Sequence, residues 1–289
     1  MHPRFLRSGR VRAALGPLAL AAMTGASVIA VIWQSKFGQG FDGTLFLGAF
    51  AIGLAAQLVD GALGMAYGIT ATTFLLAGGA TPLAATASVH VAEIFTTGAS
   101  GLAHWRLGNV DRRLFRQLII PGVIGAVVGA WVVSRIDSAA LRPWVSGYLL
   151  VMGIYIAGKA FRAVSFVRGT NGRKLVPLAF TGALVDSIGG GGWGPIVATS
   201  LLGTGHEPGK TIGTVNAAEF FITLASGFSF VLLAGITHWE QVAGLVTGGL
   251  VVAPFAAYLT TRLPSRWLLL FVGVLVALLS AFGLIQALG

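Results

Sequence analysis

The sequence Asp186-Ser-Ile-Gly-Gly-Gly-Gly-Trp-Gly194 interrupts a long apolar stretch, and a related sequence, Asp60-Gly-Ala-Leu-Gly-Met-Ala-Tyr-Gly68, interrupts an earlier one. When residues 58–101 are laid over residues 184–227 at a constant offset of 126, about 18 of the 44 positions are identical without a gap. Ordered self-similarity of this length indicates an internal duplication. The chain is therefore expected to contain two related halves.

The duplication extends to polar residues as well as glycines. It pairs Asp60 with Asp186, Gly64 with Gly190, Gly68 with Gly194, Pro82 with Pro208 and Glu93 with Glu219, and it sets Ser88 on Thr214 and His90 on Asn216. Interrupted, glycine-rich apolar segments at equivalent places in two halves are the best pointer in a sequence to a transporter's substrate site near the middle of the membrane.

Composition places the chain in a bilayer, because 55% of its residues are hydrophobic and only 10% are charged. A membrane-spanning helix needs about 20 apolar residues. Runs that fit are found at Val11–Trp33, Leu83–Ala103, Leu114–Val133, Trp144–Phe161, Thr211–Ile236, Val242–Leu259 and Trp267–Leu288. The basic residues before the first run also fit a cleaved signal peptide, but its continuation to Trp33 favours a retained helix.

Loop charge predicts the orientation of these spans. Positive residues cluster in the N-terminus, around Arg112, in 159–174 and in 262–266, and such loops face the cytoplasm. The apolar stretches Thr44–Leu76 and Leu175–Leu202 must then each begin and end on one side of the membrane. The second has two arms of about 10 residues each, Leu175–Val185 and Trp193–Leu202, which is half of a ~30 Å core and predicts a re-entrant hairpin; two tilted crossings stay open for the first.

Each half thus has one hairpin and three spans, so the second half is predicted to insert upside down relative to the first. The predicted fold is an all-α membrane protein of two inverted-topology repeats with an additional N-terminal helix. Its parts are a basic N-terminus and first helix (1–43), repeat 1 (44–165) and repeat 2 (175–289). We expect a multi-pass protein of the cytoplasmic (inner) membrane with a cytoplasmic N-terminus, and a homo-oligomer is compatible with the sequence.

The glycine segments favour an anion as ligand. Glycine lets the backbone turn sharply and approach a ligand with its N–H groups, and the helix that follows presents a positive dipole end. The candidate binding residues are Gly64, Tyr67, Gly68, Ser88, His90, Gly189, Gly190, Gly191, Gly192, Trp193, Thr214 and Asn216. The alternative is structural: glycines permit close helix packing in membranes, and aromatic and polar residues also pack there.

Carboxyl groups complete the candidate site. Glu93 and Glu219 lie about ten residues into their spans, where a charge is costly and usually marks function, so they are candidates for proton coupling. The alternative is a neutral carboxyl that hydrogen-bonds backbone groups freed by the glycines. Asp60 and Asp186 precede the glycines at the place of an N-cap, so a capping role is expected for both.

Other classes of function lack their motifs. The chain has no cysteine, its five histidines form no metal-binding spacing, and the glycine run lacks the Lys and Ser/Thr of a phosphate loop. We therefore expect no metal, no cofactor and no enzymatic activity. The net charge of +10 is spread over loops between apolar runs, which indicates contact with lipid headgroups and argues against a nucleic-acid partner.

The duplicated glycine segments, together with Ser88-Val-His-Val-Ala-Glu93 and Thr214-Val-Asn-Ala-Ala-Glu219, resemble the sulfite exporter TauE/SafE family over roughly Leu45 to Leu288. The resemblance implies a secondary transporter that exports small sulfur-containing anions such as sulfite, sulfoacetate or related sulfonates. Proton coupling would come from Glu93 and Glu219. The alternative is a proton-coupled transporter of a cation or neutral solute that uses the same two glutamates.

Overall fold

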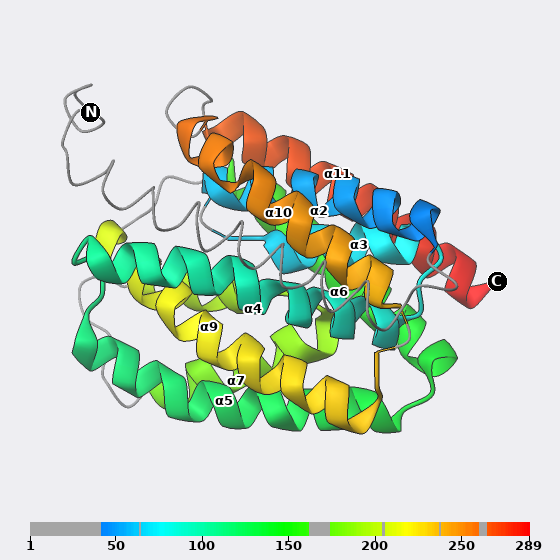
Figure 1. Cartoon of the computed structure of the whole chain (residues 1–289), viewed down its shortest axis with the longest axis horizontal. Helices are drawn as coiled ribbons and strands as arrows, with labels where there is room; N and C mark the ends of the chain where they lie inside the picture. Colours follow the sequence, from blue (N-terminus) through cyan, green and yellow to red (C-terminus); the bar gives the residue numbers. More distant parts are fainter. Residues whose placement is uncertain (1–41, 64, 162–173, 204–205, 237, 260–264) are drawn as a thin grey trace.

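The fold is a bundle of long and short helices, seen in a computed structural model that describes residues 42–63, 65–161, 174–203, 206–236, 238–259 and 265–289 (Figure 1). Every regular element in these ranges is helical. In chain order they are α2 (Gly43–Leu63), α3 (Tyr67–Ala77), α4 (Pro82–Arg106), α5 (Arg112–Arg135), α6 (Ser138–Lys159), α7 (Leu175–Gly189), the π-helical η3 (Gly194–Ala198), α8 (Thr199–Gly203), α9 (Pro208–Leu233), α10 (Trp239–Leu259) and α11 (Ser265–Leu288). The predicted run Val11–Trp33 lies outside the described residues.

Five of the described helices are long and apolar enough to cross a membrane, namely α5, α6 and α9 in full, with most of α2 and α11. The predicted all-α membrane fold is thereby confirmed. Helix α4 is less apolar although it has 25 residues, because it carries polar residues such as His90 and Glu93. Both of these side chains are buried, so α4 turns its polar groups to the protein interior.

Each of the two predicted hairpins consists of a longer arm, a break and a short return arm. The return arms are α3, with 11 residues, and the continuous pair η3 and α8, with five residues each. Helices of this length reach about 15–17 Å, or half of a ~30 Å hydrocarbon core. For the first hairpin, the sequence was also compatible with two tilted crossings of the membrane. The return arm α3 is too short to be such a crossing.

The break in the second hairpin comes later than the sequence indicates. Its first arm was expected to end at Val185, but α7 continues to Gly189 and ends where Gly190 adopts a left-handed φ of 72°. A residue with a Cβ atom disfavours that conformation, whereas glycine adopts it readily. Apolar periodicity does not mark this end, because the four residues after Val185 continue the helix and only the backbone of Gly190 stops it.

Helices related by the 126-residue offset pack in related ways. Helix α2 packs on α10 as its counterpart α7 packs on α5, while α4 packs on its own counterpart α9 and α6 on α11. Figure 1 shows α2, α10 and α11 along one side of the bundle and α5, α7 and α9 along the other, with α4 between them. Opposite insertion of the two halves into a bilayer stays a prediction from loop charge.

Candidate functional site

The two glycine segments meet at the centre of the bundle. A Cβ atom added at Gly68 would lie 2.7 Å from the Cα atom of Gly191, and one added at Gly194 would lie 2.8 Å from the Cβ atom of Met65. The 126-residue offset exchanges these two contacts, since it relates Gly68 to Gly194 and Met65 to Gly191. The breaks of the two hairpins are therefore packed directly on each other.

The glycines of the second break face protein atoms in this conformation. Cβ atoms at Gly189 and Gly192 would overlap Tyr148, and one at Gly190 would overlap the side chain of Thr72. The carbonyl oxygens take part as well: Thr72 donates a hydrogen bond to the Gly190 carbonyl, and Tyr148 donates one of 2.6 Å to the Gly191 carbonyl. A ligand can reach these glycines only after the hairpins or α6 move.

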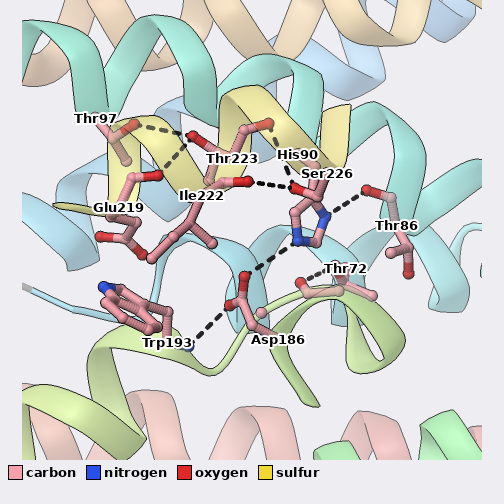
Figure 2. Close-up of polar contacts among 12 residues, drawn as sticks. Thr72, Thr86, His90, Thr97, Asp186, Trp193, Glu219, Ile222, Thr223 and Ser226 are labelled. Carbon is pink, nitrogen blue, oxygen red and sulfur yellow. Dashed lines mark hydrogen bonds and ion pairs between the residues drawn. The ribbon is translucent and has the colours of Figure 1, made fainter. Parts of the chain in front are cut away.

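Asp186 connects the break to α4, as Figure 2 shows. Its Oδ1 atom accepts a hydrogen bond of 2.8 Å from the backbone N–H of Trp193, at the start of the return arm, and its Oδ2 atom lies 3.1 Å from Nε2 of His90. The Asp186 carbonyl also accepts a hydrogen bond from Gly191. The side chain thus satisfies a free N–H group at a helix start and holds a buried histidine.

His90 lies between two acceptors. Its Nδ1 atom is 2.8 Å from the Thr86 carbonyl oxygen, which can only accept, so Nδ1 must carry a proton. The contact between Nε2 and Asp186 also needs a proton, and either partner can supply it. Whichever of the two holds that proton, the pair of His90 and Asp186 is neutral as a whole, and it is fully buried.

The two glutamates lie on α4 and α9 beside this pair. Glu93 is buried, its Oε1 atom approaches Gly68, and its Oε2 atom has no hydrogen-bond partner within the part of the chain that is described. Glu219 is half-buried. One turn further along each helix, Thr97 donates a hydrogen bond to the Glu93 carbonyl, and Thr223 donates one to the Glu219 carbonyl. The two threonine hydroxyls lie 3.3 Å apart, and Figure 2 draws the contacts of Thr223 with Thr97 and Glu219.

Four carboxyl groups therefore gather at the centre, since Asp60, Glu93, Asp186 and Glu219 are close enough to interact electrostatically. They share a low-dielectric interior, where like charges repel strongly. Lys159 of α6 contacts both hairpins: its Nζ atom donates to Thr199 of α8 at 2.6 Å and lies 3.4 Å from the sulfur of Met65, in the break of the first hairpin.

The remaining candidate residues lie outside the contact between the two breaks or hold it to neighbouring helices. Tyr67 and Trp193 are buried, and each donates a hydrogen bond of 3.2 Å to a backbone carbonyl, of Leu245 and Val215 respectively, so both hold the return arms to neighbouring helices. The repeat relates the His90–Asp186 contact to Asn216 and Asp60, but Asn216 donates its hydrogen bond to Ser100 instead. Ser88 and Thr214 lie towards opposite ends of the bundle, and Gly64 is outside the described residues.

The sequence did not predict several residues that make contacts at or near the hairpins. Tyr148 and Lys159 lie on α6, outside the aligned segments, and no pattern in that helix points to the hairpins. Thr97 and Thr223 did carry a signal, because the offset of 126 residues that relates the glutamates also relates these threonines, which prove to be hydrogen-bonded to each other.

Two broken hairpins that meet beside buried carboxyls in an all-helical membrane protein define the architecture of a membrane transporter. Residues 49–283 match the family model described as "Sulfite exporter TauE/SafE", and the chain belongs to this family. A similar protein is "Probable membrane transporter protein YtnM" of Bacillus subtilis (strain 168), which is 40% identical over 243 residues that cover 81% of each chain. No solved structure matches the chain.

Proposed function

We propose that the protein is a secondary transporter that exports small sulfur-containing anions, such as sulfite, sulfoacetate or related sulfonates, across the cytoplasmic membrane, and that protons take part in the cycle. The family description supports the substrate class. The observation that carries the role of protons is the cluster of Asp60, Glu93, Asp186 and Glu219 at the contact between the hairpins.

The acidic centre sets a condition on anion binding. An oxyanion next to ionised carboxylates would be repelled, and the interior of the bundle does little to screen that repulsion. An anion can therefore bind at the centre only together with protons on the carboxyls. Glu93 is the strongest candidate to take up that proton, because it is buried and its Oε2 atom has no partner among the described residues.

The membrane potential favours export. Moving one elementary charge across 100 mV is worth about 2.3 kcal/mol, so a dianion that leaves a cell with a negative interior gains about 4–5 kcal/mol. The orientation predicted from loop charge, with the N-terminus in the cytoplasm, completes this proposal. This gain holds for a dianion that crosses alone. Each proton that leaves with it reduces the charge moved by one and the gain by about 2.3 kcal/mol, so the potential drives export only while fewer protons leave than the anion has charges.

The test is flux of labelled sulfite and sulfoacetate in proteoliposomes at several pH values. Anion affinity is expected to fall as pH rises in the wild type, because deprotonated carboxyls repel the substrate. Glu93→Gln fixes a neutral side chain of the same shape, so the affinity of this variant should lose much of its pH dependence. Glu219→Gln is the matched change in the other half. Full pH dependence in both variants would show that neither glutamate couples protons to the anion.

The acidic centre also favours a second candidate function, the proton-coupled transport of a cation or a neutral solute that binds Glu93 and Glu219. The two functions differ in their competitors. If sulfite and sulfoacetate neither move nor inhibit flux, while a cation or an uncharged solute is carried with protons, the second function replaces the first.

A further inference from the structure

The two ends of the α4 and α9 pair differ, although the internal repeat relates them. At one end the loop 107–111 is tied to the start of α9: Thr214 accepts a hydrogen bond of 2.8 Å from the backbone N–H of Asp111, and Lys210 donates one of 2.6 Å to the Gly108 carbonyl. A Cβ atom at Gly213 would overlap the carbonyl of Asn109. The loop and the helix are in direct contact, so this end is closed.

At the other end, residues 234–236 and 238, which follow α9, lie beside the start of α4, but among the described residues no hydrogen bond joins the two segments. Between them lies a cavity of about 160 Å³, whose lining includes Thr81, Ala84, Ser88, Gly235 and His238. The offset places Ser88 on Thr214, but the two hydroxyls differ in what they bind. Thr214 accepts from Asp111 and donates to the Lys210 carbonyl. Ser88 is only 2% exposed and lines the cavity, and its hydroxyl makes no hydrogen bond with another described residue.

The chemistry of the lining suits an anion. The first turn of α4 begins at this cavity, after the cap residue Thr81, and the N-terminus of a helix carries a partial positive charge. The hydroxyl of Ser88 and the imidazole of His238 add donors, and the lining contains no carboxylate. Ser88 also lies two residues before His90, so the cavity adjoins the helix segment that leads to the acidic centre.

We propose that this cavity is an outer vestibule in which the exported anion binds before release, and that the contacts of Lys210 and Asp111 with their partner segments close the cytoplasmic side in the same conformation. Loop charge gives the sides, because Arg112 and Arg113 follow the closed loop directly whereas no Lys or Arg is found in 234–241. The identity of the ligand rests on the proposed function. The claim that one end of the α4 and α9 pair is open and the other closed does not depend on it.

The natural chain is well suited to a test by thiol labelling, because it has no cysteine. Ser88→Cys and Thr214→Cys are a matched pair at positions that the repeat relates, and His238→Cys provides a thiol at an exposed residue of the cavity lining. A membrane-impermeant thiol reagent is applied from outside to spheroplasts that express each variant. Sulfoacetate serves as the protecting anion, because sulfite itself reacts with such reagents.

We expect the reagent to label Ser88→Cys and His238→Cys from outside, to leave Thr214→Cys unmodified until the membranes are opened, and to label Ser88→Cys severalfold more slowly when sulfoacetate is present. Equal labelling of Ser88→Cys and Thr214→Cys, or no labelling of Ser88→Cys while His238→Cys reacts, would overturn the vestibule. So would labelling that sulfoacetate does not slow in a protein that transports it.

Flux measured on the wild type in parallel separates the two proposals. A wild type that carries no sulfur anion refutes the proposed function, whatever the labelling shows. In a wild type that does not carry sulfoacetate, protection of Ser88→Cys by sulfate or phosphate would support the vestibule and assign it a different anion.

Discussion

Replacement of Gly191 by alanine tests whether the contact between the two hairpins holds the bundle together. The backbone at Gly191 has a φ of 145°, and an added Cβ atom would lie 2.8 Å from the Cα atom of Gly68 and overlap the nitrogen of Ile69. Backbone strain in this region costs about 1–3 kcal/mol and overpacking about 1–3 kcal/mol more. The two effects together predict a loss of about 4 kcal/mol from the free energy of unfolding.

The assay is thermal unfolding of the purified protein in detergent, followed by intrinsic tryptophan fluorescence. At about 2–4 °C per kcal/mol for a chain of this size, Gly191→Ala should lower the apparent melting temperature by about 8 °C or more. Because membrane proteins commonly unfold irreversibly, all variants are heated at the same scan rate.

Two control variants separate strain from packing. Gly79 has a φ of 94° with no atom within 4 Å of an added Cβ, so Gly79→Ala should show strain alone, about 1–2 kcal/mol. Gly147 lies within α6 and also has open space around an added Cβ, so Gly147→Ala should be neutral or slightly stabilising. If Gly191→Ala melts within about 2 °C of Gly147→Ala, the hairpins are not packed as described.

Two further changes probe the polar contacts of the second break. Asp186→Ala leaves the Trp193 N–H and Nε2 of His90 without their partner, which should cost about 1–3 kcal/mol of unfolding free energy for each group. Asp186→Asn keeps an acceptor and a donor in place and should be more stable. If the asparagine variant melts at a temperature as low as the alanine variant, the two hydrogen bonds of Asp186 do not stabilise the fold. Tyr148→Phe removes the hydrogen bond to the Gly191 carbonyl and should cost about 1 kcal/mol, which the same scan measures against Tyr155→Phe on the same helix.

Much of the fold could be predicted from the sequence, because hydropathy and glycine position act locally. The apolar runs within the described residues predicted helices that the structure contains, and four of them, α5, α6, α9 and α11, are long and apolar enough to cross a membrane. The glycine segments predicted the two breaks to within a few residues. The end of α7 was misplaced by four residues, because the helix continues through the weak helix formers after Val185 and ends only where Gly190 begins a run of glycines with positive φ. The 126-residue offset gave the pairs of related helices, which in the structure pack in related ways.

The candidate site could be predicted less completely, because its contacts join segments that are distant in the chain. The sequence related His90 to Asn216 and Asp60 to Asp186, but it did not show that His90 would bind the aspartate of the opposite half. It also treated the glycines as a surface open to ligand, whereas Tyr148 fills the space beside them. Tyr148 belongs to α6, the third helix after the first hairpin, and only tertiary packing brings it there.

The two halves differ at a position that affects the charge of the acidic centre. Both keep an aspartate and a glutamate, but one has His90 where the other has Asn216, and an amide cannot gain a proton as an imidazole can. His90 forms a neutral buried pair with Asp186, so three carboxyls of the four, Asp60, Glu93 and Glu219, are left without a basic partner among the described contacts. Under the proposed function, such a centre would take up protons together with the anion. His90→Asn, which makes the halves alike, is then expected to raise the number of protons carried per anion, measured as the ratio of proton flux to anion flux in proteoliposomes.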